Sequence, residues 1–145
     1  MNEDKKNWNV LTGEFDGKPI ITSYRNDVDK LIQNHKYSFQ IGVAIPLLRP
    51  DAKGLPERDE AEILWKIEDR LSVEMEETHN IIYVMSISTQ NMREFVFYAP
   101  QWKPKEYEET IREIEKNLDS GHKIQFLMQE DSNWETYKKF ANQRS

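Results

Sequence analysis

Carboxylates are the side chains whose type and spacing come closest to chemistry in this sequence. Glu68 and Asp69 form an adjacent pair within a helical pattern, and Glu62 lies about two turns before Asp69 along the same helix. Adjacent helical residues point about 100° apart, so the pair does not converge on one atom. Acid–base catalysis would need a further group from elsewhere in the chain. No catalytic residue is assigned, and a small hydrolase using carboxylates remains the alternative to a binding protein.

The other reactive side chains are few and scattered. His35, His79 and His122 lie far apart, none has the i, i+4 spacing of a helical metal site, and no HExxH motif occurs. The absence of cysteine excludes thiolate nucleophiles, Cys-ligated zinc and iron–sulfur clusters. Neither GxSxG, the P-loop nor GxGxxG is present. We therefore expect neither a metal nor a cofactor.

The stretch MREFVFYAP, residues 92–100, could be a stacking platform or part of a core. In a strand, Phe95 and Phe97 share one face and Tyr98 lies on the other. The strand expected in YSFQIGVAIP has an apolar face, and its opposite face carries only small or polar residues, on which bases could not stack. We therefore assign Phe95 and Phe97 to the core. Tyr98 is left for the open face, as a candidate partner-binding residue.

Two further aromatic residues lie near the end of the chain. Trp134 and Tyr137 are three residues apart, so they share one face of a short helix in DSNWETYKKF. They are interpreted either as an anchor that holds this helix on the sheet or as a clamp for a ligand. Burial of two large rings is sufficient to hold a helix that is too short to be stable alone.

Charge is concentrated on one segment. The 145-residue chain has a net charge of −6, and residues 57–77 carry nine acidic and three basic side chains, which accounts for the whole imbalance. The acids, Glu62, Glu68 and Asp69 among them, form either a solvated helix surface or a docking face for a protein with a basic surface. The acidic balance disfavours nucleic acid as a partner, single-stranded RNA included.

The elements that must position these residues follow from periodicity. An Asp16-Gly17 turn predicts a hairpin near the start, and Leu64, Ile67, Leu71 and Met75 recur at helical spacing. From Tyr37 the order is β-α-β-β-α-β, which predicts a ferredoxin-like antiparallel sheet with two helices on one face. We predict a single α+β domain, residues 1–145, divided into a hairpin extension (1–36), the ferredoxin-like core (37–129) and a C-terminal helix (130–145).

We expect the hairpin to cover the open face of the sheet through Trp8, Ile20 or Tyr24.

The sequence also predicts the surroundings of this domain. No apolar run is long enough for a signal peptide or a membrane span, which predicts a cytoplasmic protein without a membrane partner. A homodimer is compatible with the sequence.

Several short motifs, in this order, resemble the bacterial family catalogued as domain of unknown function 695. They are a Trp near the start followed by DGKP, then GLPERDE, KIEDRL, REFVFY and EDSNWETYKKF. The resemblance spans nearly the whole chain. It implies a bacterial cytoplasmic protein without an established activity and supplies no catalytic residues. Together with the charge pattern, it favours a non-catalytic protein-binding or regulatory module.

Overall fold

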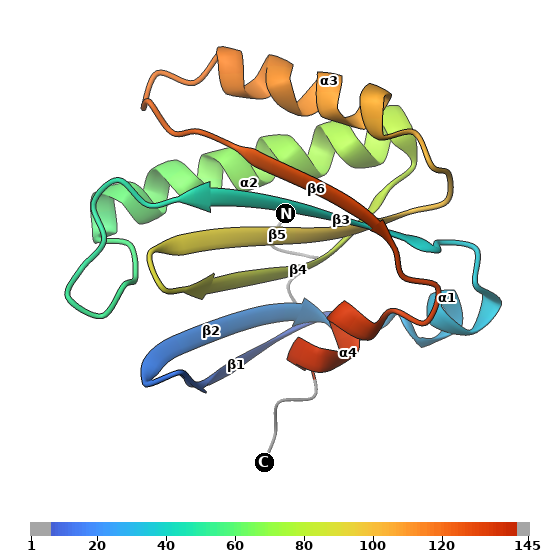
Figure 1. Ribbon diagram of the computed structural model, residues 1–145, viewed down its shortest axis with the longest axis horizontal. Helices are drawn as coiled ribbons and strands as arrows, with labels where there is room; N and C mark the ends of the chain where they lie inside the picture. The colour runs from blue at the N-terminus through green and yellow to red at the C-terminus, as the bar shows by residue number, and fades with distance from the viewer. Residues whose placement is uncertain (1–6, 142–145) are drawn as a thin grey trace.

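The computed structural model describes residues 7–141, which form a six-stranded antiparallel sheet and four helices (Figure 1). The strands are β1 (Trp8–Phe15), β2 (Lys18–Arg25), β3 (Phe39–Pro46), β4 (Ile82–Thr89), β5 (Met92–Ala99) and β6 (Gln125–Glu130). The helices are α1 (Asp29–Asn34), α2 (Arg58–His79), α3 (Pro104–Lys116) and α4 (Glu135–Ala141). The strand order is β1-β2-β4-β5-β3-β6. The predicted α+β class is confirmed.

The N-terminal hairpin extends the sheet. Asp16 and Gly17 take positive φ values of 55° and 77°, as a tight two-residue turn requires. β2 then pairs antiparallel with β4, with Ile20 opposite Thr89. The expectation that the hairpin covers the open face of the sheet is therefore wrong. The edge of β4 offers unpaired backbone groups, and a strand satisfies these better than a layer of side chains can.

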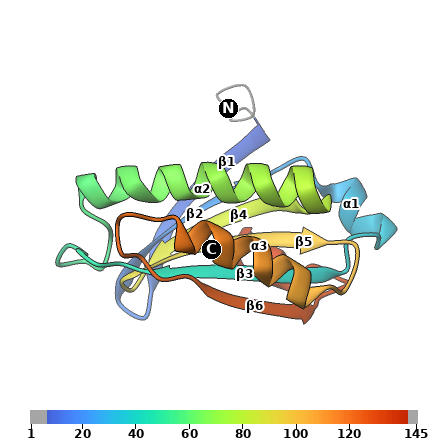
Figure 2. The same ribbon diagram turned by 90° about the horizontal axis from the view of Figure 1, so that it is seen from above.

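α2 and α3 cover one face of the sheet, and they run next to each other over the strands (Figures 1 and 2). Phe95 and Phe97 of β5 are fully buried there and pack with the apolar stripe of α2 and with Tyr107, Ile111 and Ile114 of α3. The assignment of Phe95 and Phe97 to the core is confirmed. None of the described helices is both long and apolar enough to cross a membrane.

The opposite face of the sheet packs against α4. Trp134, Tyr137 and Ala141 form a second buried cluster with Val96 and Tyr98 of β5, which also includes Ile20 and Tyr24 of β2. These two β2 side chains contribute to the cluster as members of the sheet, while the covering layer comes from the C-terminal helix. The sheet is thus buried on both faces near its centre.

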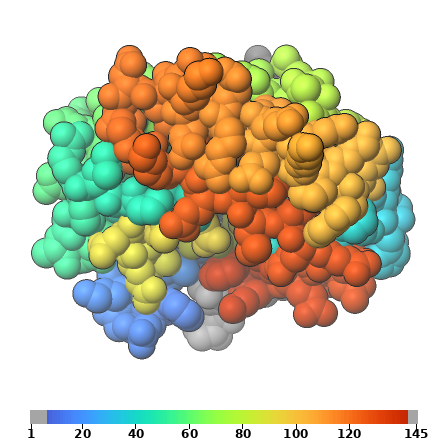
Figure 3. Space-filling model, turned by 45° about the horizontal axis from the view of Figure 1, so that its top comes forward, coloured from blue at the N-terminus to red at the C-terminus, as the bar shows by residue number. Residues whose placement is uncertain are grey.

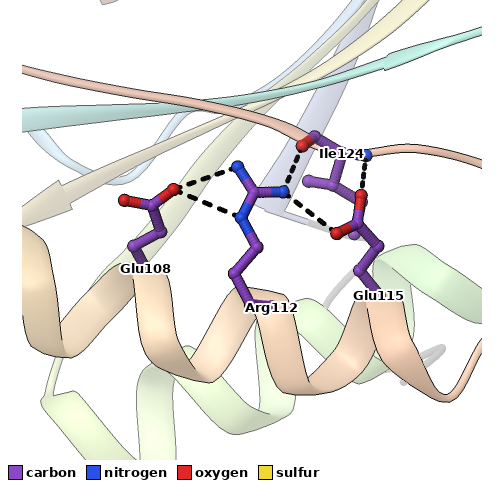
Figure 4. Close-up of polar contacts among 4 residues, drawn as sticks. All are labelled: Glu108, Arg112, Glu115 and Ile124. Carbon is purple, nitrogen blue, oxygen red and sulfur yellow. Dashed lines mark hydrogen bonds and ion pairs between the residues drawn. The ribbon is translucent and has the colours of Figure 1, made fainter.

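A polar network ties α3 to the segment that leads into β6 (Figure 4). Arg112 donates from Nε and Nη2 to Glu108 Oε2 at 3.2 and 3.0 Å, and from Nη1 to the carbonyl of Ile124. The N–H of Ile124 donates to Glu115 Oε2 at 2.6 Å. α3 and β6 consequently lie side by side on the surface (Figure 3).

Candidate functional site

A groove lies between α2 and the β1–β2 hairpin, and we call it the α2–hairpin groove. It encloses a cavity of about 420 Å³, within the usual size range of ligand sites. Its lining combines aromatic and acidic side chains, chiefly Trp8, Trp65, Tyr83, Glu68, Asp69 and Glu76. Carboxylates, indoles and a phenol therefore meet in one concave site.

The groove arises because the sheet is wider than its helical cover. α2 packs its apolar stripe on the central strands, while the hairpin adds two strands beyond β4. The side chains that α2 turns toward the hairpin are Trp65, Glu68, Asp69, Ser72 and Glu76, which recur at helical spacing along one side of the helix. One helix thus forms a continuous polar wall opposite the strands.

Aromatic rings form the other part of the lining. Trp8, at the start of β1, packs on Tyr83 of β4 with ring centroids 5.1 Å apart and planes tilted by 47°. Tyr83 in turn packs against Phe97, with centroids 5.0 Å apart, which joins the groove to the core. Trp65 is 57% exposed, unlike the buried stripe of the same helix. Exposed tryptophan beside a cavity is typical of binding surfaces.

Two carboxylates of α2 hold Tyr83 in place. The Tyr83 hydroxyl donates to Glu68 Oε2 at 2.6 Å, and its backbone N–H donates to Glu76 Oε2 at 3.4 Å. Burial raises the pKa of the Tyr83 phenol well above its ordinary value, and the Glu68 charge adds to that shift. Tyr83 therefore remains a neutral hydrogen-bond donor to Glu68.

Two arginines accompany these acids. Arg25, in the lining, donates from Nε and Nη2 to the two oxygens of Asp27 at 3.0 and 2.8 Å. Arg93 of β5 is only 8% exposed, and its Nε has no hydrogen-bond partner among residues 7–141. Burial lowers the pKa of Arg93, and the nearby Glu68 and Tyr83 oppose that shift. The acids of α2 thus dominate the open surface of the groove.

The residues singled out from the sequence fall in different places. Glu68 and Asp69 both line the groove, although adjacent residues of a helix point in different directions. Glu62 is exposed outside the lining and lies 3.9 Å from Arg58 in an i, i+4 ion pair. Within residues 7–141, no group of three or more His, Asp or Glu side chains is placed to hold a metal ion.

The three aromatic candidates, Tyr98 of β5 and Trp134 and Tyr137 near the C-terminus, are buried. Tyr98 is fully inaccessible, stacks on Trp134 with centroids 4.0 Å apart and planes 8° apart, and donates to Asp131 at 2.7 Å. Trp134 donates from Nε1 to the carbonyl of Tyr37, and the Tyr137 hydroxyl donates to the carbonyl of Arg25. Neither Tyr98 nor Trp134 has a ring face open to a partner or ligand. The contacts of Trp134, which immediately precedes α4, and of Tyr137 within it attach this helix to the sheet and the hairpin.

Sequence reasoning missed the aromatic half of the groove. Trp65 does carry a signal, since it follows Leu64 and falls outside the stripe of α2, where a buried ring is not expected. Trp8 and Tyr83 carry no such signal, because their contact depends on the position of the hairpin beside β4. Pairing between strands distant in sequence is not encoded in either strand alone.

A second cluster was also hidden in the sequence. Glu60, fully buried, accepts hydrogen bonds from the N–H groups of Leu48 and Arg49 at 2.5 and 2.8 Å. His122 Nε2 lies 2.6 Å from Glu60 Oε2, and Ser120 Oγ lies 2.7 Å from His122 Nδ1. The order Ser–His–Glu resembles a hydrolytic relay, but none of the three residues lines the groove. The cluster joins the β3–α2 loop to the α3–β6 loop.

The chain is similar to a known protein family. A family model described as "Family of unknown function (DUF695)" matches residues 6–141, nearly the whole chain. A search of curated proteins found no match. The match spans both walls of the α2–hairpin groove.

Proposed function

Since the chain belongs to the family of unknown function DUF695, which supplies no activity to transfer, we propose from the geometry that it is a non-catalytic binding module. Its partner is a protein with a basic surface. Docking takes place at the α2–hairpin groove, and the acidic side of α2 guides the approach of the partner.

The observation that carries this proposal is the meeting of α2 acids and exposed aromatic surface at one cavity. Glu68, Asp69 and Glu76 supply negative charge, while Trp8 and Trp65 supply apolar contact area. Complementary charge accelerates encounter, and large aromatic side chains supply much of the binding free energy at protein interfaces. The concentration of negative charge on α2 also attracts a partner with a basic surface.

A small hydrolase is the second candidate, because Glu68 and Asp69 share the cavity. A general acid has to be protonated near neutral pH, and a desolvated site is the usual means. Asp69 is exposed to water rather than desolvated, and Glu68 already accepts a hydrogen bond from the Tyr83 hydroxyl. This pair is better suited to attract a cation than to donate a proton. Binding of single-stranded RNA is disfavoured by the same charges.

The test compares two charge-neutralised double variants. One carries Glu68→Gln with Asp69→Asn inside the groove, and the other carries Glu62→Gln with Glu77→Gln on exposed positions of α2 outside the groove lining. Both remove two negative charges from α2, so they are matched in charge and differ in position. A partner isolated with the wild-type protein is then used to measure association rates at low and high salt.

We expect the groove variant to associate more slowly and with a flatter salt dependence than the control variant. Equal rates and equal salt slopes for the two variants would contradict docking at the groove. Hydrolysis of a substrate by the wild-type protein, lost in the groove variant, would instead favour the hydrolase.

We further propose that β3 to β6 with α2 and α3 form a ferredoxin-like unit. It is supported by the order β4-β5-β3-β6, in which β5 lies between β3 and β4, and β3 lies between β5 and β6. In this view the hairpin is an addition to the edge of the unit. The addition creates the second wall of the groove and so the site.

A further inference from the structure

We propose that the α2–hairpin groove binds one organic cation, the ammonium or guanidinium head of a Lys or Arg side chain on the partner. The inference rests on the proposed function and names the chemical group that the groove recognises. It follows from the lining of the cavity and from the partners already held by its polar groups.

The groove is rich in aromatic side chains. Trp8 and Trp65 line the cavity together with Tyr83, whose buried ring packs against Trp8, and Trp65 keeps more than half of its surface exposed. The negative face of an aromatic ring attracts a cation, tryptophan most strongly, and aromatic cages are a recurrent solution for binding alkylated ammonium groups. A neutral apolar ligand would use the same rings but would make no use of the negative charge beside them.

The wall that α2 forms is negatively charged. Glu68, Asp69 and Glu76 lie on the side of α2 that faces the cavity, within reach of a group held against Trp65. The basic residue of this lining, Arg25, already donates two hydrogen bonds to Asp27. Among the described residues, the groove therefore presents a net negative surface. An anionic ligand would meet three like charges.

The arrangement of the carboxylates favours an organic over an inorganic cation. A divalent metal requires several oxygen or nitrogen ligands converging on one point. Within residues 7–141 no such group of His, Asp or Glu is present. Carboxylates spread along a helix suit a larger cation, whose charge is distributed over several N–H donors.

The experiment uses the full chain and four small probes: acetyl-arginine methylamide, acetyl-lysine methylamide, the neutral isostere acetyl-norleucine methylamide, and magnesium chloride. Binding is read from the indole N–H signals of the four tryptophans in ¹⁵N NMR spectra. Trp134 is fully buried, and Trp102, although 53% exposed, lies outside the groove lining, so both serve as internal controls.

We expect the arginine and lysine probes to shift the signals of Trp8 and Trp65 in a saturable manner, while Trp102 and Trp134 stay unchanged. The Glu68→Gln/Asp69→Asn variant should bind about tenfold more weakly, equivalent to about 1.4 kcal/mol. The Glu62→Gln/Glu77→Gln control should bind as the wild type does. Trp65→Leu, at an exposed position, should also weaken binding without unfolding the protein.

Three results would overturn the inference: equal shifts with the norleucine probe, which would indicate an apolar site; shifts with magnesium, which would indicate a metal site; and no saturable shift with any probe. The proposed function fails separately, if no partner association depends on the groove charges although the cationic probes bind. Conversely, groove-dependent association with a partner, combined with no response to the probes, removes only the inference.

Discussion

Glu60 is a buried carboxylate whose three hydrogen bonds offset the cost of removing its charge from water. Burial by itself raises the pKa of Glu60, but the N–H of Leu48, the His122 ring and the N–H of Arg49 outweigh it, so the pKa lies below its ordinary value. A folded-state pKa below the unfolded one means that ionised Glu60 stabilises the fold. Its role is structural, since it connects two loops that are distant in sequence.

The Glu60→Gln variant tests this role. An amide nitrogen would face a backbone N–H that now donates to Glu60, leaving a buried donor unsatisfied, so we expect a loss of about 1–3 kcal/mol at neutral pH. In the wild type, the contribution of Glu60 is fully present above the unfolded pKa of about 4.3 and is lost as the pH falls through the lower folded value. Urea unfolding at several pH values should show that the free energies of unfolding of the two proteins converge as the pH falls into the acid range.

The exposed Glu77→Gln change serves as the control and should follow the wild type at every pH. If the free energies of unfolding of wild type and Glu60→Gln ran parallel down to about pH 3, ionised Glu60 would contribute nothing to stability. The pH range is chosen because the unfolded pKa of glutamate is about 4.3.

At the scale of elements, α4 depends on one ring. The helix has seven residues, too few to be stable alone, and Trp134 connects it to β5 by stacking on Tyr98. Asp131 reinforces the start of the helix, because its carboxylate accepts from the N–H groups of Glu135 and Thr136 at 2.8 and 3.1 Å.

Trp134→Ala should therefore destabilise the whole protein by about 3–5 kcal/mol, as truncation of a buried aromatic residue does. Lys138→Ala, on the exposed side of the same helix, should cost little. The measurement is the free energy of unfolding from a denaturant titration. If Trp134→Ala melts like Lys138→Ala, the ring is not the anchor of the helix.

Local patterns in the sequence predict most of these elements but not their assembly. The Asp16-Gly17 turn, the alternation around Phe95 and Phe97, and the helical spacing of Leu64 to Met75 each depend on residues a few positions apart, and the structure contains all three. The position of β2 beside β4 joins residues more than sixty positions apart, as in Ile20 opposite Thr89. Glu60 and His122 escaped prediction for the same reason, and Glu60 looked like one more solvated acid of α2.

At the scale of the whole molecule, the fold places the acidic side of α2 at the margin of the sheet. The chain concentrates its net charge on α2, and the hairpin turns one side of that helix into the wall of a cavity. Glu68 and Asp69, which the sequence marks only as members of a charge run, become neighbours of Trp8 through this arrangement.

Charge on this surface should matter little for folding. Glu62→Gln with Asp69→Asn removes two exposed charges, and exposed charges contribute little to stability. We expect the free energy of unfolding to change by less than about 0.5 kcal/mol. Thermal and urea unfolding at low and high salt provide the measurement. A loss well beyond this limit would mean that these acids support the fold, which would weaken the case that they serve binding.

The contact of α4 with the opposite face of the sheet also determines how the protein can be made. A ribosome delivers all six strands before residues 134–141, so the nascent chain presents Tyr98 and Val96 to solvent without their cover. The hydrogen bond from Tyr137 to the carbonyl of Arg25 then joins segments separated by more than a hundred residues. Such distant pairing slows the final step of folding. Nascent chains halted before Trp134 should accordingly be recognised by chaperones that bind exposed aromatic surface.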